Sequence, residues 1–500
     1  MVFVLKRPLL MASLAVLSTA ALLLLGNGMN PVWPFMWVAP LPVLLLAAEA
    51  KSWRFVALPA VLSMLLGSLT MLYYLHFVLH APIAAWLIPF SIASLLFAAG
   101  VLLFRALLHR GAIVSACIAL PALWTVCEYL SSFAPTNGTA GSLAYTQLRF
   151  LPFLQLASVT GPWGITFLLL LLPSAIAAAF YLRRTKRLQA TLVVGSVLAL
   201  LVAVLLFGIV RLAAPESQQT IKVGLLATDK VQIAEAGTAT QDLLRSYAEQ
   251  AERLAHQGAR IIVMPEKTGV MLDRDAKTTD PILQSVADHT GATLVIGLVH
   301  VVAPYSFNEA RIYTPDRPVT TYDKQHMLPP FESKLTPGTS LTLLSQPAGP
   351  VGVAVCKDMD FIRPALDYGR AGIALMLDPA WDFNIDRVWH GHIAIMRGVE
   401  DGYAIAHSAK DGLLTVTDDR GRILGEVRSN RAPFSSLLVD VPLHHDQTIF
   451  DRLGTWFPWV AGLLLIASLA RLATSSRPDS RERSDPGSGH INSNSRNATV

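Results

Sequence analysis

Long apolar runs separated by short polar loops occupy the first 212 residues, and another apolar run lies near the end of the chain. A helix needs about twenty predominantly apolar residues to cross a bilayer. The first run follows a basic pair and resembles a signal peptide, but signal peptides have shorter apolar cores, so we expect an uncleaved helix. By this measure the pattern predicts membrane-spanning helices near 9–26, 31–48, 55–77, 85–108, 112–131, 161–182, 189–212 and 455–473.

The pattern between residues 213 and 454 predicts strands alternating with helices. Short β-branched runs are typical of buried strands, and apolar residues three and four apart predict amphipathic helices. Repeated strand–helix units with an antiparallel finish indicate a layered α/β domain. Strands are predicted near 221–226, 260–264, 292–298, 307–313, 319–323, 351–355 and 373–377, helices near 243–255, 280–290, 364–370 and 389–399, and a hairpin over 413–427.

The chain therefore divides into four predicted parts, as expected for 500 residues, which exceed what one ordinary core organises. Residues 1–212 are predicted to form a membrane domain of seven helices, and residues 213–454 a polar α/β domain. Residues 455–473 are predicted to form a C-terminal membrane helix. Residues 474–500 are rich in Ser, Arg, Asp, Asn and Gly, which predicts a disordered tail.

Composition and charge agree with a membrane protein. Hydrophobic residues make up 53% of the chain and charged ones 15%, well below the usual quarter in soluble proteins. The net charge of +5 is modest and its basic residues flank the apolar runs, which indicates membrane orientation and not nucleic-acid binding. Loops after even-numbered runs hold most of these residues, namely Lys51, Arg54, Arg105, Arg110, Arg183, Arg184, Lys186, Arg187, Arg471 and Arg477. The positive-inside rule then predicts cytoplasmic termini and an α/β domain on the opposite side.

The outer connection at 132–160 contains a segment, 150–156, that is too short to span a membrane and too apolar for open water. We expect this segment to lie along the membrane face or to form a wall over a lipid-facing cavity, where it would exclude water. Glu128 lies at the outer end of the fifth run, close to hydrocarbon. Such a charged residue is either functional or paired, or it reaches the interface by snorkelling.

Cys356 is the one cysteine outside the apolar segments, the other two being Cys117 and Cys127. Three cysteines in this arrangement predict no disulfide framework. Cys356 follows the predicted buried strand 351–355, where a chain reversal begins, so its side chain can be held rigidly and still reach a cleft. The alternative interpretation is an inert buried thiol that acts as a small hydrophobic residue.

Two other charged residues favour the catalytic interpretation. Glu266 and Lys324 each follow an apolar strand of the same domain, as Cys356 does. Strand ends at one edge of a sheet converge in space. A thiol at its ordinary pKa is mostly protonated, so it needs a neighbouring base. The carboxylate can accept the thiol proton, and the lysine can stabilise the thiolate and a developing oxyanion.

Three motifs resemble the signatures of the nitrilase (carbon–nitrogen hydrolase) superfamily: Met264-Pro-Glu266, Tyr322-Asp-Lys-Gln-His326 and Val355-Cys-Lys-Asp358. The resemblance implies an α-β-β-α sandwich and a Glu-Lys-Cys triad of Glu266, Lys324 and Cys356. Glu332 matches the superfamily's second glutamate, which orients the lysine. The predicted fold class is therefore a polytopic α-helical membrane domain with a nitrilase-like α-β-β-α sandwich domain.

Eight membrane helices around one such domain resemble the bacterial apolipoprotein N-acyltransferases, and Trp124–Glu128 and Gln155–Phe167 carry further similarity. The resemblance implies a multi-pass protein of the bacterial inner membrane with a periplasmic catalytic domain. Its reaction would move an acyl chain from a phospholipid, through a cysteine thioester, to the N-terminal amine of diacylglyceryl-cysteine in apolipoproteins. No cofactor and no nucleic-acid partner are expected.

Two other functions remain open from the residues alone. A membrane-tethered amidase would use the same cysteine chemistry with water as the final acceptor. A scaffold that binds lipidated peptides without turnover would belong to another class, and the intact triad argues against it.

The sequence also departs from the resembling family. Lys357 replaces the usual aromatic residue after the cysteine, and Asp358 replaces a glutamate. The usual Asn-Asp-Ala-Trp stretch is Asp378-Pro-Ala-Trp381, and the segment between Lys324 and Cys356 is short, which predicts a reduced lid. Lys357 and Trp381 are candidate substrate-binding residues.

Two remaining patterns on the predicted helix near 389–399 have structural interpretations. His390-x-His392 has a spacing that does not place both rings on one helix face, so no metal site is predicted. Arg397 and Glu400 are predicted to form a structural ion pair.

Overall fold

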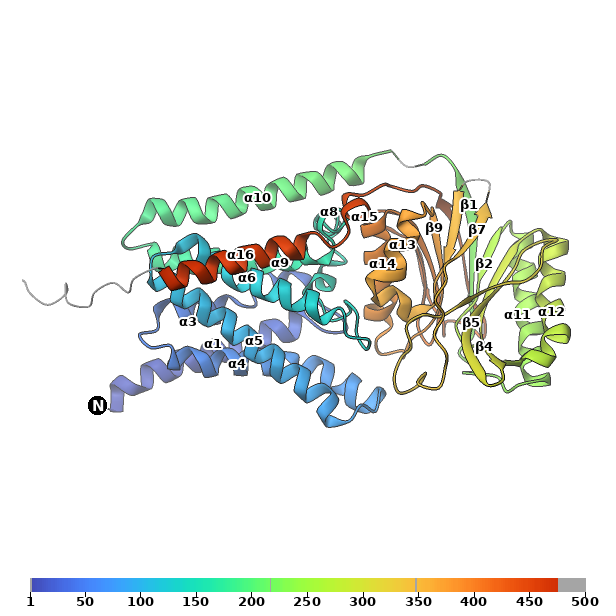
Figure 1. The fold of residues 1–500 in the computed structure, drawn as a ribbon, viewed down its shortest axis with the longest axis horizontal. Helices are drawn as coiled ribbons and strands as arrows, with labels where there is room; N and C mark the ends of the chain where they lie inside the picture. Colours follow the sequence, from blue (N-terminus) through green and yellow to red (C-terminus); the bar gives the residue numbers. More distant parts are fainter. Residues whose placement is uncertain (1, 216, 347–348, 475–500) are drawn as a thin grey trace, which may run out of the picture.

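The computed structural model describes residues 2–215, 217–346 and 349–474, which form a bundle of long helices joined to a layered α/β domain (Figure 1). The predicted tail lies almost wholly outside the described residues. The helical elements of the bundle are α1 (Val2–Gly26), α2 (Trp33–Met36), α3 (Leu41–Glu49), α4 (Arg54–Gly67), η1 (Ser68–Met71), η2 (Tyr74–Val78), α5 (Ile83–His109), α6 (Ile113–Ser131), η3 (Leu143–Gln147), α7 (Leu151–Leu154), α8 (Ala157–Thr160), α9 (Pro162–Leu182), α10 (Arg187–Ala213) and α16 (Phe457–Thr474).

Among the described residues, seven helices are long and apolar enough to cross a membrane. They match the predicted runs with one exception, because the helix predicted over 31–48 is divided into α2 and α3. Proline fixes its own backbone and is tolerated in the first turn of a helix but not in its interior. Pro34 therefore lies at the start of α2, and Pro40 and Pro42 at the start of α3. With 9 residues, α3 is about 14 Å long, half of the hydrocarbon thickness.

The helix predicted over 55–77 also changes its geometry part-way. Regular α4 ends at Gly67, and the chain continues as the 3₁₀ turn η1 and the π turn η2. The Ser68 hydroxyl donates a hydrogen bond to the Met64 carbonyl at 2.8 Å, and bonds of this kind often bend helices. The irregular turns face the α/β domain, where they line the cavity described below.

The α/β domain contains two mixed sheets, and every strand predicted between 221 and 427 is present. The first sheet has the order β13-β1-β2-β4-β5-β6, with β3 paired to β4, and the second has the order β12-β11-β10-β9-β8-β7. The strands are β1 (Thr220–Ala227), β2 (Ile261–Val263), β3 (Val270–Leu272), β4 (Thr293–Val302), β5 (Tyr305–Tyr313), β6 (Thr320–Asp323), β7 (Thr342–Gln346), β8 (Gly349–Val353), β9 (Leu375–Trp381), β10 (Ala404–Lys410), β11 (Leu413–Thr417), β12 (Ile423–Arg428) and β13 (Ser435–Pro442).

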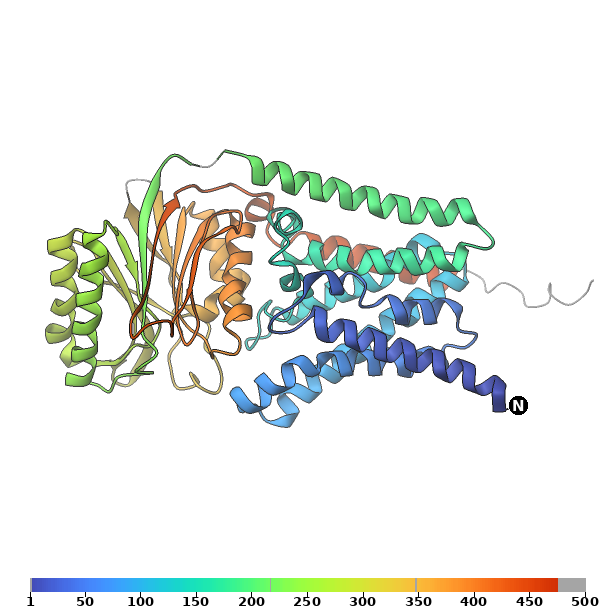
Figure 2. The ribbon, with the colours of Figure 1, turned by 180° about the vertical axis from the view of Figure 1, so that it is seen from behind.

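Helices cover the outer face of each sheet, so the domain is a four-layered α-β-β-α sandwich (Figures 1 and 2). Val263 and Ile312 of the first sheet and Val353 and Leu377 of the second belong to one buried core between the sheets. The predicted fold class is confirmed. The helical elements of this domain are α11 (Thr238–His256), η4 (Asp273–Asp275) and α12 (Ala276–Thr290) by the first sheet, η5 (Cys356–Asp360), α13 (Ile362–Arg370) and α14 (Arg387–Asp401) by the second, and α15 (Ile449–Leu453) before α16.

Helix α14 joins the two parts of the molecule. Its side chains Ile393, Ile395, Met396 and Val399 pack in the same buried core as the bundle helices. The predicted ion pair of this helix is present, with 2.8 Å between Arg397 Nη1 and Glu400 Oε2. The guanidinium also donates to the hydroxyl of Tyr145 in η3, at 3.1 Å. The layer that covers the second sheet therefore also caps the bundle, which brings the strand ends close to the membrane helices.

Helix α10 offers a test of this packing, because it runs along the bundle (Figure 2) and Gly208 lies against the backbone of Pro152. A Cβ added at Gly208 would lie 1.7 Å from the carbonyl oxygen of Pro152, at the start of α7. Backbone cannot yield as a flexible side chain can, so we expect Gly208→Ala to lower the thermal unfolding temperature of the protein in detergent, at a cost of about 1–3 kcal/mol.

Gly195→Ala on the same helix is the matched control, since an added Cβ there meets nothing within 4 Å. Alanine favours a helix over glycine by about 1 kcal/mol, so the control is expected to be neutral or slightly stabilising. Equal unfolding temperatures for the two variants would contradict the contact between α10 and α7.

Candidate active site

Cys356 begins a tight turn immediately after the buried end of β8. Its backbone lies in the left-handed region, with φ of 49°, whereas Val355 before it is extended. This region is unfavourable for a residue with a Cβ, and such strain persists only where the surroundings hold it. The Cys356 N–H donates to Asp378 Oδ1 at 2.6 Å, and the thiol lies 3.8 Å from the carbonyl oxygen of Trp381. The thiol therefore occupies a fixed position at the strand end, as predicted.

Asp358 ties this turn to the second motif. Its carboxylate accepts from the Val355 N–H at 3.2 Å and from the Tyr322 hydroxyl at 2.8 Å. It also accepts from the His326 N–H at 2.8 Å. One buried carboxylate thus holds together the segments on either side of Lys324 and Cys356, which lie far apart in the sequence. Asp358, which is shorter than the glutamate usual at this position, therefore still links the segment around Lys324 to the turn at Cys356.

The three charged residues predicted for the site meet in one place. Lys324 Nζ lies 2.7 Å from Glu266 Oε1 and 3.0 Å from Glu332 Oε2. These side chains are at most 1% exposed. Such a pair of carboxylates around one ammonium group satisfies the charge of the lysine away from water. The structure therefore brings Glu266, Lys324 and Glu332 together, and places Cys356 on the same cavity as Glu266 and Lys324.

Two further residues complete this charged cluster. Lys267 Nζ lies 2.5 Å from Glu332 Oε1, and Asn308 Nδ2 donates to Glu266 Oε1 at 2.5 Å and to Glu332 Oε1 at 2.7 Å. The sequence offered one signal for Lys267, which directly follows Glu266. It offered no signal for Asn308, which lies inside β5 and is seen to neighbour Lys324 only in the structure.

The charges around the site set its resting protonation state. Burial alone would lower the pKa of Lys324, but Glu266 and Glu332 outweigh it and raise that pKa well above the usual range. Burial would raise the pKa of Glu332, but Lys324 and Lys267 hold it well below its usual value. Burial raises the pKa of the Cys356 thiol, Glu266 raises it further, and Lys324 opposes both. The resting cysteine is therefore a neutral thiol, and its activation requires a base.

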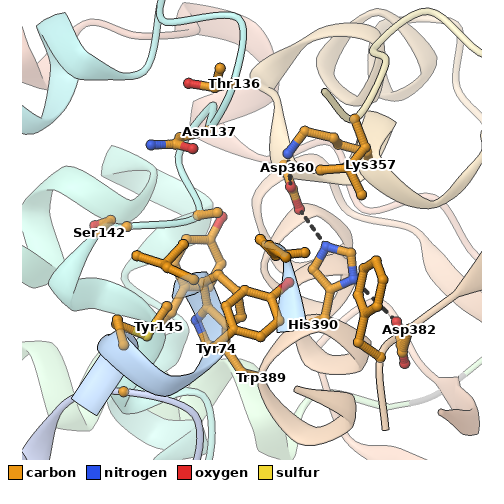
Figure 3. Close-up of a pocket in the computed structure, with 18 of the residues that line it drawn as sticks. Tyr74, Thr136, Asn137, Ser142, Tyr145, Lys357, Asp360, Asp382, Trp389 and His390 are labelled. Atoms are coloured by element: carbon orange, nitrogen blue, oxygen red, sulfur yellow. Dashed lines mark hydrogen bonds and ion pairs between the residues drawn. The ribbon is translucent and has the colours of Figure 1, made fainter. Parts of the chain in front are cut away.

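A cavity of about 690 Å³ extends from this cluster to the helices of the bundle. Glu266, Lys324, Cys356 and Trp381 line the end of the cavity at the charged cluster. Polar and aromatic residues, including Tyr74, Asn137 and Trp389, line another part of it (Figure 3). Its far end is mostly apolar and is lined by Met64, Met71, Leu75, Leu79, Phe90, Ala93 and Trp124. One continuous space therefore connects the thiol with a membrane-side apolar lining.

The sequence left two positions for the segment 150–156, along the membrane face or in the wall of a lipid-facing cavity, and the segment does not line this cavity. The wall instead comes from residues 136–146 of the same connection. Phe153 and Leu154 are fully buried and belong to the core of the bundle. Helix α7 packs against α10, and the turn that precedes α7 therefore faces the cavity.

Glu128 holds this wall in place. Its carboxylate accepts from the Trp124 indole at 2.9 Å, the Ser142 hydroxyl at 2.6 Å, the Leu143 N–H at 2.9 Å and the Thr166 hydroxyl at 2.8 Å. The carboxylate of Glu128 is therefore held inside the protein by four neutral hydrogen-bond donors.

The two candidate substrate-binding residues both face the cavity. Lys357 Nζ lies 3.0 Å from Asp360 Oδ2. The ring of Trp381 lies over Lys410, with 3.9 Å between Nζ and the ring centroid, and its indole N–H donates to Asp411 Oδ2 at 3.0 Å. Both side chains are therefore held by neighbours within a wall that a substrate would touch.

The two histidines of α14 take different partners. His390 Nδ1 lies 3.1 Å from Asp382 Oδ1, whereas His392 Nε2 lies 2.6 Å from Glu426 Oε2. No group of three or more His, Cys, Asp or Glu residues has metal-binding geometry in the part of the chain that the structure describes.

Known proteins are similar in sequence to this chain over most of its length. Residues 19–176 match the family model described as the apolipoprotein N-acyltransferase N-terminal domain. A protein of that name from Geobacter metallireducens is 28% identical over 91% of this chain and 94% of its own length. The one from Bradyrhizobium diazoefficiens is 25% identical, over 79% and 81%. An amidase structure from Nesterenkonia sp. covers 46% of this chain and 93% of its own, with 22% identity and a TM-score of 0.39.

The chain resembles the apolipoprotein N-acyltransferases. This resemblance was predicted from the three motifs and the apolar runs, and it is confirmed. The matched domain model ends within α9, before the α/β domain begins. The similarity to the whole-length relatives extends beyond it, since they cover most of the chain.

The pKa of Cys356 leads to a test of the charged cluster. Glu266→Gln removes a negative charge that raises the thiol pKa, so at pH 8 a larger fraction of Cys356 becomes thiolate. We therefore expect iodoacetamide to alkylate Cys356 faster in this variant, by about tenfold for each unit by which the pKa falls. Turnover is expected to fall by roughly 10²–10⁴-fold, because the base is lost.

Peptide mass spectrometry of Cys356 measures the alkylation separately from Cys117 and Cys127. Glu309→Gln is the matched control, since Glu309 is also a buried carboxylate of this domain but does not line the cavity. Slower alkylation of Glu266→Gln than of the wild type would refute the electrostatic assignment.

Proposed function

We propose that this protein is an acyltransferase that moves an acyl chain from a membrane phospholipid to the N-terminal amine of diacylglyceryl-cysteine in apolipoproteins. The observation that carries the proposal is the shared cavity, in which Cys356 lies at one end and apolar side chains of the bundle at the other. Such a cavity suits a reaction whose donor and acceptor both carry acyl chains. The names of the whole-length relatives support the same reaction.

In the first step, Glu266 accepts the thiol proton and the thiolate of Cys356 attacks the ester carbonyl of the phospholipid. A sulfur–carbon bond forms, and Lys324 stabilises the negative charge that develops on the carbonyl oxygen. The carbon–oxygen ester bond then breaks, and Glu266 returns the proton to the departing lysophospholipid. Glu332 and Asn308 keep Lys324 and Glu266 aligned throughout. The product of this step is a thioester on Cys356.

In the second step, the free α-amine of the lipidated peptide attacks the thioester carbonyl. A carbon–nitrogen bond forms, Glu266 accepts the amine proton, and the carbon–sulfur bond breaks. The proton passes to the sulfur, which restores the resting thiol. Water must be excluded between the two steps, because it would hydrolyse the thioester. The wall at 136–146 and the aromatic side chains around the cavity perform this exclusion.

Lys357 and Trp381 contact the substrates in this proposal. Lys357 places an ammonium group on the cavity wall beside the nucleophile, where it meets the phosphate of the donor. Trp381 presents a flat apolar surface next to the reacting carbonyl. The Lys357–Asp360 pair keeps the lysine on the wall when the cavity holds no substrate.

The proposed location is the bacterial inner membrane, with the α/β domain in the periplasm and both termini in the cytoplasm. The distribution of basic loops supports this orientation. The four-part division of the chain follows from it, with a membrane domain over 1–212, a catalytic domain over 213–454, a C-terminal membrane helix over 455–473 and a cytoplasmic tail over 474–500.

The decisive experiment separates transfer from hydrolysis. Purified protein incubated with phospholipid alone is expected to gain one acyl chain on Cys356 and then to stop, as seen by intact mass. A diacylglyceryl peptide with a free N-terminal amine then discharges the acyl-enzyme into an amide, whereas the same peptide with a blocked amine does not.

Cys356→Ser is the matched control, and it is expected to remain folded and unacylated, since a hydroxyl is a much poorer nucleophile beside a carboxylate base. Rapid release of free fatty acid from the wild type without peptide would instead identify a hydrolase. Wild-type activity in Cys356→Ser would reject the nucleophile.

A second experiment tests the orientation. A reporter that is active only in the periplasm is expected to be active when fused near Pro215 and silent when fused after Arg187. A reporter that is active only in the cytoplasm serves as the complementary control at both positions. The reverse pattern would overturn the proposed topology.

A further inference from the structure

A chain of buried acidic and basic side chains runs from the backbone of Cys356 to Lys357. It begins at the backbone of the nucleophile, where Asp378 Oδ1 accepts from the Cys356 N–H at 2.6 Å. The other oxygen of the same carboxylate, Oδ2, lies 2.7 Å from His407 Nδ1. Asp378 has no exposed surface and His407 is 3% exposed. Neither residue lines the substrate cavity, so neither is placed to touch the substrate.

The chain continues toward the cavity wall through four more groups. His407 Nε2 lies 4.0 Å from Asp382 Oδ2, and Asp382 Oδ1 lies 3.1 Å from His390 Nδ1. His390 Nε2 lies 3.7 Å from Asp360 Oδ1, whose other oxygen pairs with Lys357. Figure 3 shows His390 between the two carboxylates. Positive and negative groups alternate along the chain, which compensates charges that would be costly to bury alone.

We propose that Asp378 and His407 form a positioning pair, which holds Cys356 in its left-handed turn and aims its sulfur into the cavity. The inference rests on the proposed function for the reaction that the pair serves. A charge-assisted hydrogen bond from a carboxylate to the Cys356 N–H is strong enough to offset a strained backbone of this kind, which costs about 1–3 kcal/mol. His407 fixes the carboxylate, because its N–H occupies the second oxygen.

The strand order of the second sheet places Asp378 beside both Cys356 and His407. The residue lies within β9, which pairs in parallel with β8, the strand that leads to Cys356. On its other side β9 pairs with β10, where His407 lies directly opposite Asp378 in the register. The sheet therefore delivers the nucleophile, its carboxylate and the histidine on three adjacent strands. A side chain that sits on a rigid sheet can hold a reacting atom more accurately than one on a loop.

The test measures acylation of Cys356 in the full-length protein, with phospholipid and, separately, with a small p-nitrophenyl ester. Asp378→Ala is expected to lower the acylation rate constant by about a hundredfold with either donor, as a displaced reacting group does, with KM nearly unchanged. Asp378→Asn is expected to recover most of this rate. Its amide oxygen accepts from the Cys356 N–H while its NH₂ group donates to a neutral His407.

Two further measurements distinguish positioning from a general loss of structure. Iodoacetamide alkylation of Cys356 is expected not to slow in Asp378→Ala, since a small reagent does not need an aimed sulfur and a negative charge near the thiol has been removed. Asp418→Ala is the matched structural control, because Asp418 is an equally buried carboxylate that accepts two backbone N–H groups in a turn away from the cavity. It is expected to lower the unfolding temperature but not the acylation rate of the folded protein.

Asp378→Ala/His407→Ala is expected to be no slower than Asp378→Ala, because two residues that act as one unit are not additive. If Asp378→Ala does not fold, His407→Gln replaces it, and it is expected to lower the rate constant with KM unchanged. An unchanged rate constant in a folded variant, or a raised KM alone, would overturn the proposal. A wild type that reacts with the p-nitrophenyl ester but never with phospholipid would refute the proposed function and still leave the positioning pair testable.

Discussion

Burial of charge around one ammonium group is the constraint on which this structure depends. Lys324 is buried between Glu266 and Glu332, and removal of either carboxylate would leave an uncompensated charge inside the protein. This compensation requires Glu266 after β2, Lys324 after β6 and Glu332 in the following loop to meet at one point. The sandwich meets this requirement, because parallel strands such as β1, β2 and β4 all end at one edge of the first sheet.

The second sheet positions Cys356, which lines the same cavity as Glu266 and Lys324. Cys356 adopts an unfavourable backbone conformation, and Asp358 and Asp378 restrain it from two sides. Asp358 links the turn to the end of the first sheet, whereas Asp378 links it to the neighbouring strands of its own sheet. The site therefore lies on the joint between the two sheets, and the packed core between them keeps the sulfur and the charged cluster in register.

The helical bundle also forms part of the wall of the cavity at Cys356. Helix α14 covers the second sheet and shares a core with the bundle, so the active site cannot move away from the membrane helices without exposing apolar surface. The broken helices η1 and η2 and the turn at 136–146 then close the cavity from the membrane side. This shared core places Cys356, on the polar domain, in one cavity with apolar side chains of the bundle.

Local patterns in the sequence predicted the class of fold and most of the candidate residues of the site. Apolar runs long enough to span a bilayer, period-two and helical patterns, and charged residues directly after strands are local signals, and each depends on neighbours within a few positions. Glu266, Lys324 and Cys356 could be predicted for this reason, and Glu332 through the family motif. The residues that surround them depend on contacts between segments that are far apart in the sequence. Asn308, Asp378 and His407 lie inside strands and acquire their roles from the strand beside them, so no local pattern distinguishes them from core residues. The segment 150–156 was one candidate for the wall of the cavity, but residues 136–146 line it. No local pattern distinguishes the two, because the packing of α7 against α10 leaves 136–146 facing the cavity.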